Sequence, residues 1–128
     1  RVRKLAGRFD DALADLDLLL LKDPKDVSVN LERARVQIAA GRPDDAIATL
    51  DKLQENMPRA KVVRAEALLA KKDAEGAYRV ANEAFTSDPQ LGEAVFIRGK
   101  AQLALGRKDA AEADFKRAIE LDPTLKDR

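Results

Sequence analysis

The 128-residue sequence contains no cysteine, no histidine and no tryptophan. Without cysteine and histidine the chain lacks the common protein ligands of zinc, and it cannot form a disulfide or a reactive thiolate. It also lacks the side chain that most often moves protons near neutral pH, so a Ser-His or Cys-His catalytic arrangement cannot be assembled. These absences predict that the protein is not an enzyme and holds no metal.

The chain also lacks a strong charge of one sign, a long hydrophobic run and a glycine-rich loop. Its 24 lysines and arginines nearly balance its 23 aspartates and glutamates, so it has none of the basic excess of most nucleic-acid-binding proteins. The longest apolar runs, such as Leu18–Leu21, are far shorter than the roughly 20 residues of a membrane-spanning helix. No glycine-rich loop opens a helix after a strand. We therefore expect no nucleic acid, no membrane insertion and no cofactor.

The sequence does not identify a compartment. A chain without cysteine suits the reducing cytoplasm and the oxidising bacterial periplasm equally well, so we expect a soluble protein of either place. The chain begins at Arg1 with no methionine and no targeting segment, and we interpret it as a fragment of a longer protein.

The sequence does contain an internal repeat. The stretch AGRFDDALADLDLLLLKDP at 6–24 matches LGRKDAAEADFKRAIELDP at 105–123 in its Gly-Arg, its spaced alanines and its final Asp-Pro. Two further copies lie between them, at nearly equal intervals along the chain. Each copy has a reference residue, a small residue five places later and a proline seventeen places later: Gly7, Ala12 and Pro24; Gly41, Ala46 and Pro58; Lys72, Ala77 and Pro89; Gly106, Ala111 and Pro123.

The repeat predicts a pair of antiparallel helices. Between the reference residue and the proline, apolar residues recur at the i, i+4, i+7 spacing of one helical face, as in Ala111, Phe115 and Ala118. The proline ends this second helix because it removes a backbone donor and restricts its neighbour. The first helices, and the small residue at which each crosses its partner, are predicted at Val27–Ala40 with Ala34, Arg59–Lys71 with Ala65, and Gly92–Leu105 with Gly99.

This pattern resembles the tetratricopeptide repeat, a 34-residue helix-turn-helix with small residues and a terminal proline at set positions. The last copy fits best, with Gly99, Gly106, Ala111, Phe115, Ala118 and Pro123. The resemblance covers the chain as a single domain at 1–128, with a partial repeat at 1–26 and full repeats at 27–57, 58–91 and 92–125. It implies an all-α fold, a right-handed superhelical solenoid of antiparallel helix-turn-helix repeats.

The turns and joints of the repeats lead to structural predictions. Gly7, Gly41 and Gly106 are expected to end their helices in the left-handed conformation. Lys72 occupies the same position in the third copy and is expected to adopt the same conformation at a steric cost. The second copy is three residues short after Pro58, which predicts a tight joint and a changed angle between the second and third hairpins.

An arginine precedes the small residue at the helix crossing in every full copy: Arg33, Arg64 and Arg98. We expect Arg98 to pair with Asp114 on the second helix of its repeat, because a variant of the family joins an arginine and an aspartate at these positions. The corresponding residues of the other copies are Thr49 and Val80. The other two arginines are therefore expected to extend to solvent.

The resemblance implies that the protein binds other proteins. Solenoids bind through an extended concave surface, which in this family is lined by positions 2, 5, 9, 12 and 13 of the first helices. Positions 2, 5 and 9 give the predicted binding residues: Ser28, Leu31, Arg35, Arg59, Val62, Glu66, Glu93, Phe96 and Lys100. At position 5, Leu31, Val62 and Phe96 are expected to form an apolar row that suits an amphipathic helix or an extended peptide. The residues at position 12 are expected to pack between repeats: Ile38, Leu69 and Leu103.

Two functions are compatible with these features. The first is a non-catalytic scaffold that binds a peptide or a helix of a partner protein in the concave groove. The lysine and asparagine clamp with which some family members hold chaperone tails is not present, so that partner is not expected. The second is a structural or self-association segment of a larger protein, whose catalytic or targeting part lies elsewhere. In that case the ends of the array, with the leucines between Leu13 and Leu21, would form a homo-oligomer.

Overall fold

The computed structural model describes residues 2–53 and 56–128, with side chains described from Gly7 onward. These residues form seven α-helices and one short 3₁₀ helix, and they contain no strand. The elements are α1 (Val2–Lys22), α2 (Val27–Ala39), α3 (Pro43–Leu53), α4 (Pro58–Ala70), α5 (Ala74–Ser87), α6 (Gly92–Ala104), α7 (Lys108–Leu121) and η1 (Pro123–Asp127). The prediction of an all-helical fold made of short helix pairs is confirmed.

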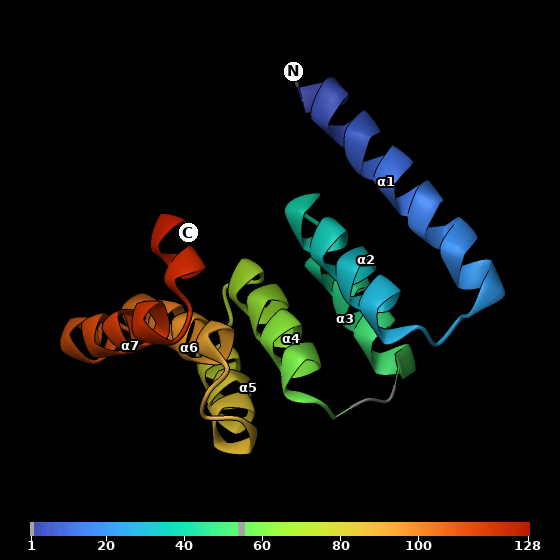
Figure 1. Ribbon diagram of the computed structural model, residues 1–128. Coiled ribbons are helices and arrows are strands. Elements are labelled where there is room, and N and C mark those ends of the chain that lie inside the picture. The colour runs from blue at the N-terminus through green and yellow to red at the C-terminus, as the bar shows by residue number, and fades with distance from the viewer. Residues whose placement is uncertain (1, 54–55) are drawn as a thin grey trace. The chain divides into compact units, whose positions relative to one another are not determined.

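The chain divides into two compact units, an N-terminal unit of residues 1–55 and a C-terminal unit of residues 56–128. In the N-terminal unit, α2 and α3 form a helical hairpin and α1 packs against α2 (Figure 1). In the C-terminal unit, α4 and α5 form one hairpin, and α6 and α7 form the next. There α5 packs against α6, the first helices α4 and α6 also touch, and η1 packs on α6 and α7. The two hairpins of this unit therefore stack as repeats of a solenoid do.

Local signals in the sequence fix the ends of α2 and α3. The N-cap of α2 is Asp26, whose carboxylate accepts a hydrogen bond from Val29 N at 3.1 Å. α3 begins with Pro43, which suits a first helical turn because that turn has no use for its amide donor. Asp44 and Asp45 follow it, where the helix dipole favours negative charge. The hairpin is thus encoded by its caps as well as by its apolar spacing.

The first copy differs from the prediction, because α1 runs through Gly7 without a turn. The residues before Gly7 extend the same helix and do not fold back to pack on it. Without such a packed partner, a continuous helix is favoured because it keeps backbone hydrogen bonds that a turn would break. The predicted left-handed turn at Gly7 is therefore wrong. Although α1 is the longest of the described helices, none of them combines the length and apolar character needed to cross a membrane.

The three-residue deletion lies where the sequence predicts it. Pro24 and Pro89 each precede the next helix by three positions, whereas Pro58 is itself the first residue of α4. The missing residues are therefore those that separate the proline from the following helix. The predicted tight joint and changed angle involve residues 54 and 55, which lie outside the described residues, and they stay predictions.

Small residues lie where the helices of a pair cross. Ala34 and Ala65 are fully buried. A Cβ atom built on Gly99 would lie 2.9 Å from Cε1 of Phe115, closer than side chains approach one another. Because the residue at this point has no side chain, the axes of α6 and α7 can lie at the short end of the usual interaxial distances of packed helices.

Gly41, Lys72 and Gly106 end the first helices of the hairpins with φ values of +79°, +71° and +82°. The same backbone hydrogen bonds close each turn. At Lys72, its own N–H donates to Leu69 O at 2.9 Å and the N–H of Asp73 donates to Leu68 O at 2.8 Å. The predicted positive φ of Lys72 is confirmed, and it costs about 1 kcal/mol relative to glycine.

Replacing Lys72 with glycine is expected to raise the free energy of unfolding by about 0.5 to 1 kcal/mol, because glycine adopts a positive φ without the steric cost of a Cβ. Urea unfolding followed by circular dichroism measures the change. Lys71→Gly is the matched control, since Lys71 has a φ of −82° and glycine there only adds freedom to the unfolded chain. The control is expected to be destabilised, and a Lys72→Gly chain no more stable than wild type contradicts the prediction.

Candidate partner-binding site

Arg98 connects three helices of the C-terminal unit. From α6 its guanidinium binds both carboxylate oxygens of Asp114 on α7, with Nη2 to Oδ1 at 2.8 Å and Nε to Oδ2 at 2.9 Å. Its Nη1 donates to Oδ1 of Asn82 on α5 at 3.0 Å, and its Cζ lies 4.2 Å from the ring centroid of Phe85. Gln102, one turn further along α6, donates to Asp114 at 2.6 Å. The predicted pair of Arg98 and Asp114 is confirmed.

The charge of Arg98 is fixed by these contacts. Hydrogen bonding to Asp114 raises the pKa of Arg98 above its ordinary value, although burial acts in the opposite direction. A raised pKa stabilises the folded state at any pH below the ordinary value, and this contribution is lost only as the pH rises through the still higher folded-state value. The contribution of Arg98 is therefore fully present at neutral pH.

The N-terminal unit has the same arrangement around Arg33, the counterpart of Arg98. Arg33 on α2 donates from Nη1 to the hydroxyl of Thr49 on α3 at 2.7 Å, and from Nε to the carboxylate of Asp17 on α1 at 2.8 Å. Gln37 donates its amide to Thr49 at 2.8 Å and accepts from Arg33 at 3.0 Å. The prediction that Arg33 extends to solvent is wrong, because these groups provide the hydrogen bonds that a half-buried guanidinium needs.

In the hairpin of α4 and α5 the corresponding positions are apolar. Arg64 is kept, but Leu68 stands in place of the glutamine and Val80 in place of the aspartate or threonine. Val80 is buried in the core of the C-terminal unit, and Leu68 packs against the same core. Arg64 is half-buried, and its predicted extension to solvent stays a prediction.

The apolar row predicted at position 5 is not an open surface. Val62 is 1% exposed and lies in the core formed by α4, α5 and α6. Phe96 is 8% exposed, its ring centroid lies 5.4 Å from that of Phe115, and it shares a buried cluster with Leu125 of η1. Leu31 on α2 is half-buried. The expectation of an accessible row is therefore corrected, because neighbouring helices and η1 cover two of its three members.

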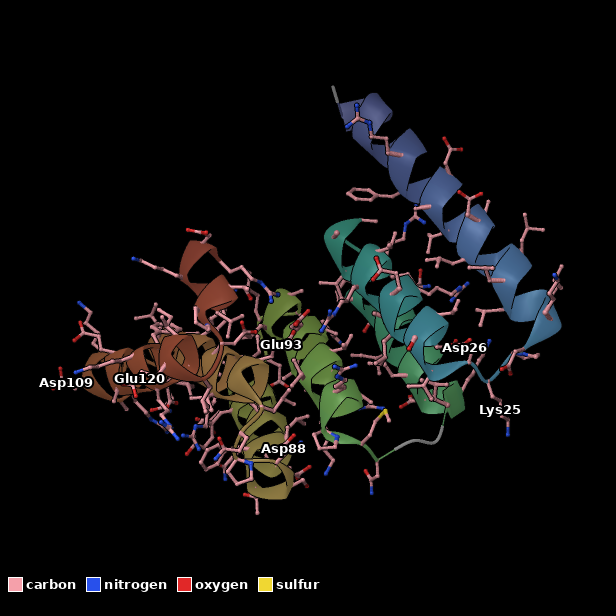
Figure 2. The ribbon with its side chains drawn as sticks, in the orientation of Figure 1. Lys25, Asp26, Asp88, Glu93, Asp109 and Glu120 are labelled. Carbon is pink, nitrogen blue, oxygen red and sulfur yellow. The ribbon has the colours of Figure 1, made fainter. Side chains whose placement is uncertain are left out.

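The polar residues predicted at positions 2 and 9 lie at or near the surface. Three are exposed and three are half-buried: Ser28, Arg59 and Lys100, and Arg35, Glu66 and Glu93. Glu93, labelled in Figure 2 near the start of α6, forms an ion pair with Arg128 at 3.7 Å. The ammonium of Lys100 lies 4.9 Å from the ring centroid of Phe96, so it covers part of that ring. Ser28, Arg59 and Lys100 are thus the members of this set that are exposed to solvent.

We define the α4–α6 face as the exposed and half-buried residues of these two touching helices at repeat positions 2, 9, 12 and 13, except the core-packed Leu69: Arg59, Glu66, Ala70, Glu93, Lys100, Leu103 and Ala104. Leu103 is 50% exposed, so the prediction that it packs between repeats is wrong. The exposure of Leu103 follows from its position, because among the described residues no further first helix follows α6 to cover it. Leu69, its counterpart on α4, does pack against the core. Ile38 in the N-terminal unit is half-buried.

The α4–α6 face carries charges of both signs and an exposed apolar side chain, which are groups found in protein interfaces. Cations, carboxylates and one exposed leucine can form ion pairs at the edge of a contact and an apolar contact inside it. No cluster of three or more potential metal ligands occurs within residues 2–53 and 56–128.

Sequence reasoning missed two partners of Arg98, Gln102 and Asn82. A signal for both was present, because Gln37 precedes Gln102, and Asp17 precedes Asn82, by the same interval that separates Arg33 from Arg98. Comparing copies at that constant offset identifies polar residues that recur together. Comparing each copy with the family pattern does not identify these residues.

Two models of one protein family match the chain. A model of the tetratricopeptide repeat matches residues 5–69, and a second model of the same repeat matches residues 92–125. The protein therefore belongs to the tetratricopeptide repeat family, and the predicted resemblance is confirmed. None of the curated protein sequences compared with the chain matches it.

Solved structures with a similar fold include several of MamA. The "Crystal structure of MamA" has 23% sequence identity and a TM-score of 0.69, and the match covers 91% of this chain and 70% of that one. "MamA 41-end from Desulfovibrio magneticus RS-1" has 15% identity and a TM-score of 0.71, with 97% of this chain and 77% of that one covered. At these identities the likeness concerns the fold alone, and it confirms the predicted fold class.

Replacing Arg98 with alanine is expected to lower the free energy of unfolding by about 3 kcal/mol, because it leaves the carboxylate of Asp114 buried without its cation. Arg117→Ala is the matched control, since Arg117 on the same unit forms only an exposed pair with Glu120 at 3.5 Å. The control is expected to cost no more than about 0.5 kcal/mol. Chemical denaturation of the full chain measures both values, and equal losses contradict the prediction.

A double variant separates the network from simple packing. Gln102→Leu with Asp114→Val copies Leu68 and Val80 of the preceding hairpin, so that only Arg98 and Asn82 remain of the network. Its loss of stability is expected to be smaller than the sum of the two single losses by at least about 1 kcal/mol, since each single variant leaves a polar partner unpaired. Additive losses would show that these groups do not act as a unit.

Proposed function

We propose that the protein is a non-catalytic scaffold that binds a peptide or a helix of a partner protein, and that in the C-terminal unit the first helices α4 and α6 form the binding surface. The observation that carries this proposal is the α4–α6 face, where an exposed leucine, Leu103, lies beside exposed alanines and charges of both signs. An apolar contact with a polar rim is the usual composition of a protein interface. Membership of the tetratricopeptide repeat family supports the proposal, because solenoids of such repeats bind through extended surfaces.

The charges of the α4–α6 face indicate the chemistry of the partner. Arg59 and Lys100 are positive, whereas Glu66 and Glu93 are negative. A matching segment carries both signs and one apolar side chain for contact with Leu103. Because Val62 and Phe96 of the apolar row are buried, we expect an affinity on the order of micromolar, about −8 kcal/mol.

The proposal includes no catalysis. The sequence has no histidine or cysteine to serve as a base or a thiol nucleophile. The adjacent carboxylates Asp44 and Asp45 are exposed in the first turn of α3, where the helix dipole accounts for both.

Reversing the two cations of the α4–α6 face, with Arg59→Glu and Lys100→Glu, is expected to weaken partner binding at least about tenfold, because each reversal replaces an attraction with a repulsion. The partner is captured on the immobilised full chain and identified by mass spectrometry. Its dissociation constant is then measured by isothermal titration calorimetry with purified components. The constant is also expected to rise with salt concentration.

Arg79→Glu is the matched control for this experiment. Arg79 is an exposed arginine of the second helix α5 and is not part of the α4–α6 face. The control is expected to bind as wild type does. A partner that binds the double variant and wild type equally well refutes the proposed face.

Self-association is a second candidate function, and the exposed leucines of α1 favour it. Leu18, Leu19 and Leu21 are 64%, 54% and 78% exposed. Contiguous exposed apolar side chains commonly mark an interaction site. This function would give the chain a structural role in a homo-oligomer or in a larger protein.

Under self-association, the wild-type chain is expected to sediment as a dimer at micromolar concentration, and Leu18→Glu with Leu21→Glu is expected to return it to a monomer. The physical reason is that two buried carboxylates at an apolar contact cost more than the contact gains. Analytical ultracentrifugation measures the mass, and Leu103→Glu on the other unit is the control that leaves the dimer unchanged. A wild-type chain that is monomeric at every concentration excludes this function.

A further inference from the structure

The N-terminal unit contains a cavity of about 260 Å³ between α1, α2 and α3. Its apolar walls are Leu20, Pro24 and Leu53, and its polar lining residues are Asp17, Asn30, Arg33, Thr49 and Lys52. The volume is below the roughly 300 to 1,000 Å³ of small-molecule sites, so the cavity suits a single side chain better than a cofactor. It shares no residue with the α4–α6 face, and it is a separate site.

The C-terminal unit has a region that corresponds to this cavity, and a leucine side chain fills that region. At the interval that separates Arg33 from Arg98, the wall residues have counterparts: Leu20 corresponds to Phe85, Asn30 to Val95 and Leu53 to Ala118. These three counterparts lie in one cluster with Leu125 of η1. Leu125 is 1% exposed, so its side chain is enclosed by them and by their neighbours. In the C-terminal unit, the region that corresponds to the cavity therefore encloses the side chain of Leu125.

A short turn presents that leucine. In the segment Asp122-Pro123-Thr124-Leu125, the carboxylate of Asp122 accepts from the N–H of Thr124 at 3.1 Å, and Leu125 N donates to Asp122 O at 3.0 Å.

The same turn precedes α6. In Asp88-Pro89-Gln90-Leu91, Asp88 accepts from the N–H of Gln90 at 3.1 Å, and Leu91 packs against the core of α4, α5 and α6. The chain therefore uses an Asp-Pro-x-Leu turn twice to insert a leucine. At the same interval before Leu125 the sequence has Ala60, which has no isobutyl group to insert.

The polar groups that line the cavity do not oppose an apolar occupant. Asn30 donates both amide hydrogens to backbone oxygens, to Pro24 O at 3.0 Å and to Asp26 O at 2.9 Å. Arg33 donates to Asp17 and Thr49 in the network described above. A leucine can enter without breaking these bonds, so its burial is not offset by the loss of a hydrogen bond.

We propose that this cavity binds the leucine of an Asp-Pro-x-Leu turn presented by a partner polypeptide. The one carboxylate among the described residues that line the cavity, that of Asp17, is paired with Arg33 at 2.8 Å, and Lys52 provides a cation there for an acidic segment. The partner is therefore an acidic turn with one leucine, a chemistry that this chain displays in its own residues 122–125. A second copy of the chain is not the occupant, because its Leu125 is already buried in its own unit.

The test uses the full chain and a synthetic peptide with the sequence of residues 119–128, IELDPTLKDR. Methyl resonances of Leu20 and Leu53 in a methyl-labelled chain are expected to shift saturably on titration. The same peptide with Leu125→Ala is expected to bind at least about tenfold more weakly, because it loses most of the buried apolar area. Equal binding of the two peptides, or no saturable shift at Leu20 and Leu53, overturns the proposal.

A pair of protein variants tests the role of the cavity itself, whereas the experiment above varies the peptide. Leu20→Phe copies Phe85 and narrows the cavity, and it is expected to weaken the peptide at least about tenfold. Leu21→Phe adds the same group at the next residue, which is 78% exposed and does not line the cavity, and it is expected to bind as wild type. Urea unfolding checks that both variants fold, and the peptide comparison above needs no protein variant.

Three further results are decisive. Shifts confined to Val95 and Leu121 would mean that the peptide replaces the chain's own η1, and they overturn the proposal. A concentration-dependent dimer that the peptide dissociates would make a second copy the occupant, and it also overturns the proposal. Arg59→Glu with Lys100→Glu is expected to leave peptide binding unchanged, which separates this site from the α4–α6 face.

Discussion

The close approach of two helices at a small residue is the constraint on which the hairpins depend. At Gly99 a single added carbon would collide with Phe115, and Ala34 and Ala65 are fully buried at the same point of their pairs. Axes this close leave no room for a long side chain in the crossing itself. The arginine one residue earlier, as in Arg98, must therefore pass beside the crossing, where it lies between the second helix of its own repeat and that of the repeat before. Its position is a consequence of the small residue.

The network around that arginine contributes more to register than to stability. Removing water from a guanidinium and a carboxylate costs free energy, and the attraction between Arg98 and Asp114 has to offset that cost before it stabilises the fold. Well-packed apolar residues at such positions often give equal stability. The hairpin of α4 and α5 supports this view, because Leu68 and Val80 fill the same positions there. A bidentate pair, unlike an apolar contact, accepts one geometry only. We infer that the polar copies fix how far neighbouring helices can slide.

The sequence predicted those features that depend on spacing. The helix pairs, the positive φ of Lys72 and the pair of Arg98 with Asp114 all follow from positions within a repeat. Depth of burial does not follow, since it depends on what packs over a residue: Phe96 shares a position with Leu31, yet Leu125 of η1 covers only the former. The turn expected at Gly7 failed for a related reason, because a helix stops at glycine only where a packed partner stabilises the turn. The polar residues of the predicted site remain at or near the surface, but its apolar row does not.

The unfilled cavity and the shortened second copy have one physical origin. In the third and fourth copies an Asp-Pro-x-Leu turn follows the second helix, and the leucine of the turn packs back on the hairpin that precedes it. When three residues at this joint are absent, Pro58 becomes the first residue of α4, and the next positions belong to a helix instead of a turn. Position 60, which corresponds to Leu125 of the fourth copy, is then a residue of α4, and it is the buried Ala60. The shortened copy therefore keeps the wall residues of the cavity but has no leucine at the position that corresponds to Leu125.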